Sequence, residues 1–163
     1  MSHNLSIRRS ATAALAGAAL LAAMSDAAGA AVPKDGYYSG PTSQQITPTD
    51  PAEQPEAGSV DFKVFKYRSS RGTVRKLLKV GATTQLECAS GEVKEDRFLA
   101  YIIVGAKINK RGRFNYSYKG FTIKGRFTTR TSATGTLSRI VGDCKAEDIT
   151  WTATRSTGGI PLP

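Results

Sequence analysis

Residues 109–131 read NKRGRFNYSYKGFTIKGRFTTRT, and this stretch decides the fold of the 163-residue chain. Seven of its 23 residues are Lys or Arg, five are Phe or Tyr, and none is acidic. In residues 113–118 and again in 121–127, aromatic or apolar residues alternate with polar or basic ones, and Lys119-Gly120 separates the two runs. Because side chains alternate between the two faces of a strand, the pattern predicts a hairpin with its aromatic side chains in the core and its cations outside.

Short runs of the same kind continue on both sides of this hairpin. Glycines or polar pairs interrupt them about every 8–12 residues, and no long stretch has the period of a helix. The sequence therefore predicts an all-β fold: an antiparallel β-sandwich, immunoglobulin-like or related, with about 7–9 strands, and a barrel as the alternative. The apolar run Leu99 to Ala106 (LAYIIVGA) predicts a buried strand. The other predicted strands lie at 36–40, 59–67, 73–80, 83–88, 106–112, 135–141 and 148–155.

The first thirty residues have the layout of a secretory signal peptide. A basic start precedes the apolar run 11–24, and Ala28 and Ala30 form an A-x-A site, so we expect cleavage near Ala30 and a protein that is secreted or associated with the cell envelope. The run is shorter than the about 18–20 residues that span a bilayer, which disfavours a membrane anchor. Arg8-Arg9 leaves both the general and the twin-arginine export routes open. The predicted divisions are 1–30 for the signal peptide, 31–58 for an N-terminal strand plus a Pro-rich loop, 59–155 for the sandwich core with 36–40 as an added strand, and 156–163 for a flexible tail.

Cys88 and Cys144 are the only cysteines, and both lie in the part predicted to be exported. Two cysteines in an oxidising compartment most often form one disulfide bond, although two buried thiols or an intermolecular bridge are alternatives. We predict the intramolecular bridge between two sheets, with Trp151 packed nearby. Two thiols without a histidine make a poor zinc site, so no metal site is predicted.

The single histidine is His3, inside the predicted signal peptide. The mature chain therefore cannot hold a Ser-His-Asp or Cys-His catalytic arrangement or a His-ligated metal. A Ser–Lys arrangement remains open, but nothing marks a particular serine. The carboxylates cluster beside predicted turns and basic residues, which indicates solvated charges and leaves a small carboxylate-based hydrolase as an unlikely alternative. We predict no enzyme, no catalytic residues and no cofactor; the carboxylates in question are Glu92, Glu95, Asp96, Glu147 and Asp148.

Basic residues dominate the second half of the chain. Removal of residues 1–30 takes away Arg8, Arg9 and Asp26 and leaves 21 Lys+Arg against 12 Asp+Glu, a net charge of +9. Between Asp96 and Asp143 there are ten Lys or Arg and no acidic residue. This pattern suits either a solvated sheet face or an electrostatic surface for a polyanion. The candidate polyanion-binding residues are Arg113, Lys119, Lys124, Arg126 and Arg130.

The predicted partner is an anionic polymer of the cell envelope or of the extracellular space. Wall polymers, acidic polysaccharide, anionic lipid head groups and extracellular DNA all satisfy the charge pattern. Specific nucleic-acid recognition is not expected, because single-strand binders need exposed aromatic rings beside the cations, whereas here the two kinds separate onto opposite faces. The alternative function is a carbohydrate- or protein-binding module that acts through its loops and through Tyr37 and Tyr38.

Several spaced motifs resemble a group of small, uncharacterised exported proteins of actinobacteria and their relatives. The motifs are G-x-Y-x-G at 36–40, Cys88 followed by Gly91, G-x-F at 112–114, and Cys144 before the terminal W-T-A-x-R at 151–155. The resemblance implies a signal peptide followed by one β-sandwich-like domain with a paired cysteine, and it carries over no catalytic residues. The loop at 41–58 and the basic stretch at 107–130 depart from that pattern.

Overall fold

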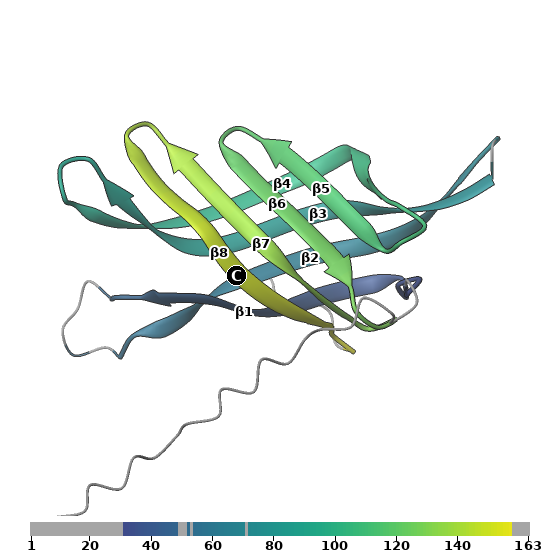
Figure 1. The fold of residues 1–163 in the computed structure, drawn as a ribbon, viewed down its shortest axis with the longest axis horizontal. Helices are drawn as coiled ribbons and strands as arrows, with labels where there is room; N and C mark the ends of the chain where they lie inside the picture. Colours follow the sequence, from purple (N-terminus) through teal and green to yellow (C-terminus); the bar gives the residue numbers. More distant parts are fainter. Residues whose placement is uncertain (1–30, 49–51, 53, 71, 158–163) are drawn as a thin grey trace, which may run out of the picture.

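The computed structural model describes residues 31–48, 52, 54–70 and 72–157, and this part of the chain is all-β (Figure 1). The predicted signal peptide, most of the predicted tail and part of the Pro-rich loop lie outside the described residues. Among the described residues, there is no helix long and apolar enough to cross a membrane. The eight strands are β1 (Gly36–Ile46), β2 (Glu56–Ser69), β3 (Gly72–Cys88), β4 (Val93–Ile108), β5 (Arg113–Tyr118), β6 (Phe121–Phe127), β7 (Ser132–Val141) and β8 (Cys144–Arg155).

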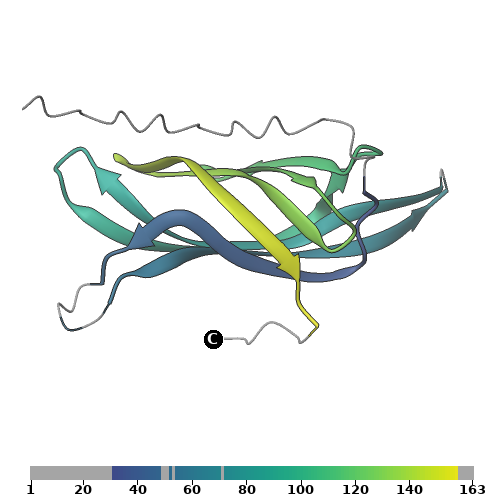
Figure 2. The ribbon, with the colours of Figure 1, turned by 60° about the horizontal axis from the view of Figure 1, so that its bottom comes forward.

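The strands form one antiparallel sheet that folds over into two layers (Figure 2). Their order is β4-β3-β2-β1-β8-β7-β6-β5, so β1–β4 make one layer and β5–β8 make the other. Strands that follow one another in the chain mostly lie next to each other in the sheet. The connectivity is therefore a meander and differs from the Greek key of immunoglobulin domains. The predicted two-layer antiparallel fold is confirmed, and the sheet also closes partly on itself, as the predicted barrel alternative requires.

Strand β8 closes a ring of four strands. Near its end it pairs with β1, where Tyr38 lies opposite Arg155, and near its start it pairs with β3, where Cys88 lies opposite Cys144. Between these two points β1 separates from β8. There the side chain of Gln44 on β1 forms hydrogen bonds with the backbone of Gln85 on β3. Its amide nitrogen donates a hydrogen bond to the carbonyl of Gln85, and its amide oxygen accepts one from the backbone N–H of Gln85 at 2.8 Å.

The core between the layers is a cluster of aromatic rings centred on Phe62. The ring of Phe62 stacks on Tyr38 from the same layer at 5.3 Å and meets Trp151 from the other layer edge-on at 5.7 Å. Trp151 lies against the sheet because Gly125 and Gly135 have no side chains; a Cβ on Gly135 would lie 2.6 Å from the Trp151 ring and 2.0 Å from a backbone oxygen. The sequence alternation in 121–127 is confirmed, since the side chains that it assigns to the core are buried there: Phe121, Ile123 and Phe127.

The disulfide bond predicted between Cys88 and Cys144 is present. It joins β3 of one layer to β8 of the other, as predicted for a bridge between sheets. Trp151 lies further along the same strand, in the aromatic cluster.

Three differences from the sequence prediction concern β1, β2 and β4. The strand predicted at 36–40 runs on to Ile46 and is not an addition to the core, because Tyr38 is fully buried between the layers. β2 begins at Glu56, so the Pro-rich loop is shorter than predicted. The run at 99–106 is not buried throughout: Leu99 is 55% and Tyr101 67% exposed, because β4 ends the strand order and turns one face to solvent.

We expect the disulfide bond to contribute about 4 kcal/mol to stability, because it closes a long loop in the unfolded chain. The double variant Cys88→Ser/Cys144→Ser, and the reduced protein, should therefore unfold at a clearly lower urea concentration than the oxidised protein. Urea unfolding followed by circular dichroism, with free thiols counted in each sample, measures this. Equal midpoints for the three samples would contradict it.

Gly135→Ala should destabilise the fold by about 1–3 kcal/mol or more, because the new methyl group overlaps the Trp151 ring and a neighbouring carbonyl. Thr136→Ala, one position along β7 with its side chain in solvent, is the matched control and should cost less. Thermal unfolding of both variants provides the comparison. A Gly135→Ala protein as stable as the control would show that the ring does not depend on this glycine.

Candidate functional site

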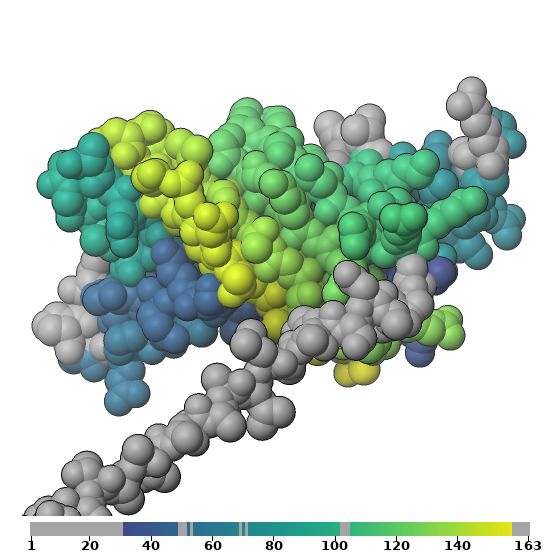
Figure 3. All heavy atoms as spheres, viewed as in Figure 1, coloured from purple at the N-terminus to yellow at the C-terminus, as the bar shows by residue number. Residues whose placement is uncertain are grey.

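The outer surface of β5–β8 carries two complete rows of polar side chains across four strands. This surface faces the viewer in Figures 1 and 3. The backbone register places the side chains in line, because directly paired residues on one face lie about 5 Å apart. We call these eight residues the basic–hydroxyl face: Arg113, Arg126, Thr134 and Thr152 in one row, and Asn115, Lys124, Thr136 and Thr150 in the next.

The cations of this face lie together on β5 and β6. Arg113 is directly opposite Arg126, and Lys124 is two residues from Arg126 on the same strand, hence about 7 Å away along it. No acidic residue occurs in β5, β6 or β7. Like charges that face each other across a strand pair reduce stability, so the Arg113–Arg126 pairing is unfavourable by itself.

The hydroxyl groups of the face lie on β7 and β8. Thr134 and Thr136 pair with Thr152 and Thr150, which gives four neighbouring hydroxyls beside the cations. A shallow groove of about 520 Å³ runs over them to the point where β1 leaves β8, and Thr42 and Ser43 form its other side. Trp151, whose side chain is buried, also lines this groove.

The structure brings together three of the five residues predicted to bind a polyanion. Arg113 and Lys124 are exposed and Arg126 is half-buried, all on the basic–hydroxyl face. Lys119 lies in the turn between β5 and β6, and its ammonium group lies 5.3 Å from the centre of the Tyr118 ring. Arg130 lies at the other end of β6, in the loop that precedes β7. Alternation identified the face, but the turns at both ends of β6 remove these two cations from it.

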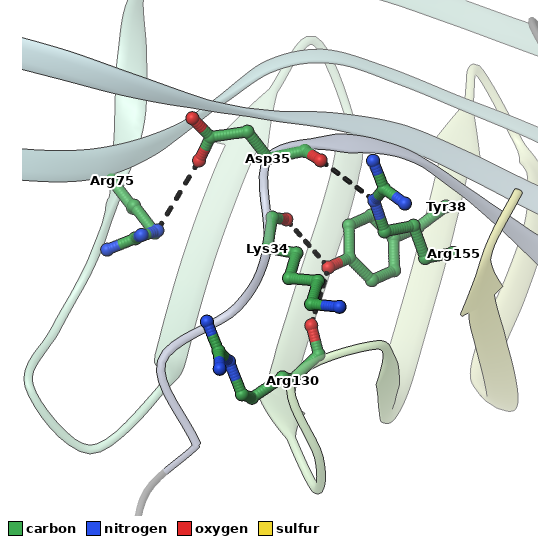
Figure 4. A network of polar contacts seen from close by, with 6 residues as sticks. All are labelled: Lys34, Asp35, Tyr38, Arg75, Arg130 and Arg155. Atoms are coloured by element: carbon green, nitrogen blue, oxygen red, sulfur yellow. Dashed lines mark hydrogen bonds and ion pairs between the residues drawn. The ribbon is translucent and has the colours of Figure 1, made fainter. Parts of the chain in front are cut away.

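The alternative function assigned ligand binding to Tyr37 and Tyr38, and this is wrong for Tyr38, which is fully buried; Figure 4 shows its polar contacts. Its hydroxyl lies 2.7 Å from the carbonyl oxygen of Lys34 and 3.0 Å from that of Arg130, and donates its proton to them. Burial raises the pKa of this phenol, and the charge of Arg155 acts in the opposite direction. Tyr38 thus ties the start of the described chain to the loop between β6 and β7, a structural role.

Four of the five carboxylates considered for catalysis, all except Asp148, form ion pairs. Glu95 pairs with Arg97 at 2.7 Å on the outer side of β4, whereas Asp96 points the other way and binds Arg139 of β7 at 2.7 Å. The pairs Glu92–Lys94 and Lys145–Glu147 repeat the first arrangement. The three possible metal ligands that lie close together among the described residues are Cys88, Asp143 and Cys144, and both thiols are consumed by the disulfide.

The outer surface of β1–β4, on the far side of the molecule in Figure 1, holds aromatic rings and lysines that the sequence analysis did not combine. One row across it is Tyr37–Lys63–Lys79–Tyr101. The next row contains Phe65, Lys76 and Lys107, and Tyr67 and Leu99 extend the surface at its two ends. We call these nine residues the tyrosine–lysine face: Tyr37, Lys63, Phe65, Tyr67, Lys76, Lys79, Leu99, Tyr101 and Lys107.

Asp61 is the acidic residue beside this face. It lies between Ser39 and Gly81 in the row next to Lys79, and a Cβ on Gly81 would meet its carboxylate at 2.5 Å. Burial raises the pKa of the Asp61 carboxyl, and Lys79 lowers it by a smaller amount. Its Oδ2 atom is buried and makes no hydrogen bond to the described part of the chain.

The alternation in 59–67 could have identified three of the nine residues of this second face, since Lys63, Phe65 and Tyr67 share one parity. Five others come from β3 and β4, whose register depends on bulges that alternation does not reveal. No protein-family model, curated protein or solved structure matches the chain.

Arg113→Thr should raise the free energy of unfolding by about 0.2–1 kcal/mol in low salt, because it removes one of two like charges that face each other. The gain should shrink in high salt, which screens exposed charges. Arg111→Thr, in the turn before β5, removes the same charge outside the rows and is the control. A loss of stability in Arg113→Thr, or an equal gain in both variants, would contradict the like-charge interpretation.

Proposed function

We propose that this protein is an exported, non-catalytic β-domain whose basic–hydroxyl face binds an anionic polymer of the cell envelope or the extracellular space. The observation that carries the proposal is the placement of Arg113, Arg126 and Lys124 side by side on strands without an acidic residue. Such a surface has a positive potential that attracts polyanions over distances of about one Debye length. The predicted signal peptide supports export to the compartment in which such polymers occur.

The hydroxyl rows narrow the class of polymer. Thr134, Thr136, Thr150 and Thr152 offer donors and acceptors beside the cations, which suits a ligand that has its own hydroxyl groups next to its charges. No aromatic side chain occurs among the eight residues of this face, so stacking of bases or sugar rings is not its mode of binding. An acidic polysaccharide or a polyol phosphate combines hydroxyls with carboxylates or phosphates and matches both features.

The ligand charges would be bound by guanidinium and ammonium groups. Arg113 and Arg126 each carry a planar fork of donors that fits a carboxylate or phosphate, whereas Lys124 acts as a point charge. The threonine hydroxyls would then fix the register of the chain on the face. Affinity should depend strongly on salt, because a bound polyanion releases its counterions.

The test is binding of residues 31–163 to two soluble polymers, polygalacturonate and a polyglycerol phosphate, at low and at physiological salt. Arg113→Gln/Lys124→Gln/Arg126→Gln should weaken binding at least about tenfold, since one hydrogen bond to a charged group contributes about 1.5–3 kcal/mol. The matched control is Lys76→Gln/Lys79→Gln/Lys107→Gln, which removes three charges from the opposite face and should bind nearly as the parent protein does.

Two results would overturn the proposal. Absence of binding to both polymers and to a delipidated envelope fraction at low salt would leave the basic–hydroxyl face as a solvated surface. An equal loss of affinity in the two triple variants would show that net charge, not this face, determines binding. Preference for one of the polymers would identify carboxylate or phosphate as the ligand group.

A further inference from the structure

The tyrosine–lysine face exposes large apolar groups, unlike the basic–hydroxyl face. Tyr101 is 67%, Leu99 55% and Tyr67 45% exposed. Leu99 and Tyr101 lie two residues apart on one side of β4, and Tyr67 lies on β2 beyond the start of β1. Exposed apolar groups gathered on one surface of a small protein mark a site of interaction.

Lysines accompany the rings on this surface. The ammonium group of Lys76 lies 4.5 Å from the centre of the Tyr67 ring, that of Lys63 4.9 Å from Tyr37, and that of Lys79 5.9 Å from Tyr101. Three of the four tyrosine or phenylalanine rings therefore carry a cation over one face. Lys107 is a fourth, exposed lysine, and Asp61 balances one of these charges.

Strand β4 makes the surface accessible from the side. It ends the strand order of its layer, so it has a strand neighbour on one side only in the described structure. Its register with β3 jumps from Lys79–Tyr101 to Leu77–Ala106, so that residues 102–105 lie opposite a single residue of β3. Such a bulge interrupts the ladder and turns the edge away from pairing with another strand.

We propose that the tyrosine–lysine face docks the protein on the surface of an anionic lipid bilayer. Tyrosine rings and lysine side chains share one preference: each has an apolar body and a polar or charged tip, and both settle at the level of the lipid head groups. Leu99, Tyr101 and Tyr67 enter the boundary between head groups and acyl chains. The lysines bind the phosphates, and each strengthens binding to an anionic membrane by about fivefold.

A lipid surface fits these groups better than a single-stranded nucleic acid does. A base stacks on a free ring face, and lysines already cover Tyr37, Tyr67 and Tyr101 on one side. An exposed Leu99 adds nothing to stacking but adds directly to membrane insertion. A neutral or acidic glycan would require several amides or carboxylates for its hydroxyls, and the nine described residues of this face include neither.

The two faces lie on opposite layers, so docking on lipid leaves the basic–hydroxyl face turned toward the solvent (Figure 2). The protein could then hold an envelope polymer close to the membrane. The docking proposal does not depend on the polymer proposal, because it rests on different residues and a different ligand.

The first test is sedimentation with vesicles of phosphatidylcholine and phosphatidylglycerol in equal parts, compared with phosphatidylcholine alone. We expect binding to the anionic vesicles and little to the neutral ones. Lys76→Gln/Lys79→Gln/Lys107→Gln should weaken binding by about 100-fold, if the three lysines act independently. Arg113→Gln/Lys124→Gln/Arg126→Gln removes the same charge from the other face and is the matched control, which should lose less than about fivefold.

The second test examines the apolar contribution without a change in charge. Leu99→Ser/Tyr101→Ser should weaken binding about tenfold or more while leaving its salt dependence in place. In the variant Tyr101→Trp, the new indole reports insertion, because Trp151 is buried and gives a constant background. Its emission should shift to the blue on anionic vesicles and be quenched by lipids brominated on the acyl chains.

The proposal is overturned if the two triple variants lose equal affinity, since binding would then follow net charge. It is also overturned if Tyr101→Trp shows no shift and no quenching on vesicles that bind the protein. Binding to a thirty-residue deoxythymidine oligomer that exceeds vesicle binding and that depends on Tyr101 would assign the face to nucleic acid instead. Urea unfolding of each variant confirms that loss of binding is not loss of fold.

Discussion

Strand β8 forms hydrogen bonds with three other strands, and this sharing holds the two layers together. It pairs along its length with β7, near its end with β1 and near its start with β3. The disulfide bond fixes the junction with β3, and the Tyr38 hydroxyl network closes the opposite end. Between them, Trp151 reaches from β8 to Phe62 across the core. The layers therefore cannot slide past one another without breaking backbone pairs, a covalent bond and the aromatic cluster.

This rigidity determines what the outer surfaces can do. Each candidate face consists of side chains on paired strands, so their spacing is that of the sheet and changes little on binding. The cations of the basic–hydroxyl face need no loop to order before they meet a ligand, which reduces the entropic cost of association. On the side of the sandwich where β4 lies over β6 and β7, side chains and not backbone pairs join the two layers. There Phe98 stacks on Phe121 at 4.1 Å, and Arg139 covers Phe98 while it binds Asp96, so one ion pair joins β7 to β4.

The sequence predicts which side chains share one face of a strand, but it does not predict which strand faces are buried by the other layer. Alternation assigned Phe121, Ile123 and Phe127 to the core correctly, because β6 lies inside its layer. The same rule fails for Tyr118, which is 48% exposed at the end of β5, where the strand order stops. It could not identify Tyr38 as buried, since that depends on pairing between β1 and the last strand of the chain. The disulfide was predictable because only two cysteines exist, whereas the tyrosine–lysine face requires the register of four strands.

The alternative to a binding role is that both cationic faces merely keep the protein soluble. Three exposed ion pairs of this chain join residues two positions apart: Glu92–Lys94, Glu95–Arg97 and Lys145–Glu147. Mixed signs of this kind are typical of a solvated surface. On the basic–hydroxyl face, by contrast, two like charges, Arg113 and Arg126, stand directly opposite each other, and the residues of β7 that pair with Arg126 and Lys124 are threonines. A surface selected only for solubility gains nothing from that cost, whereas a surface that meets an anion recovers it on binding.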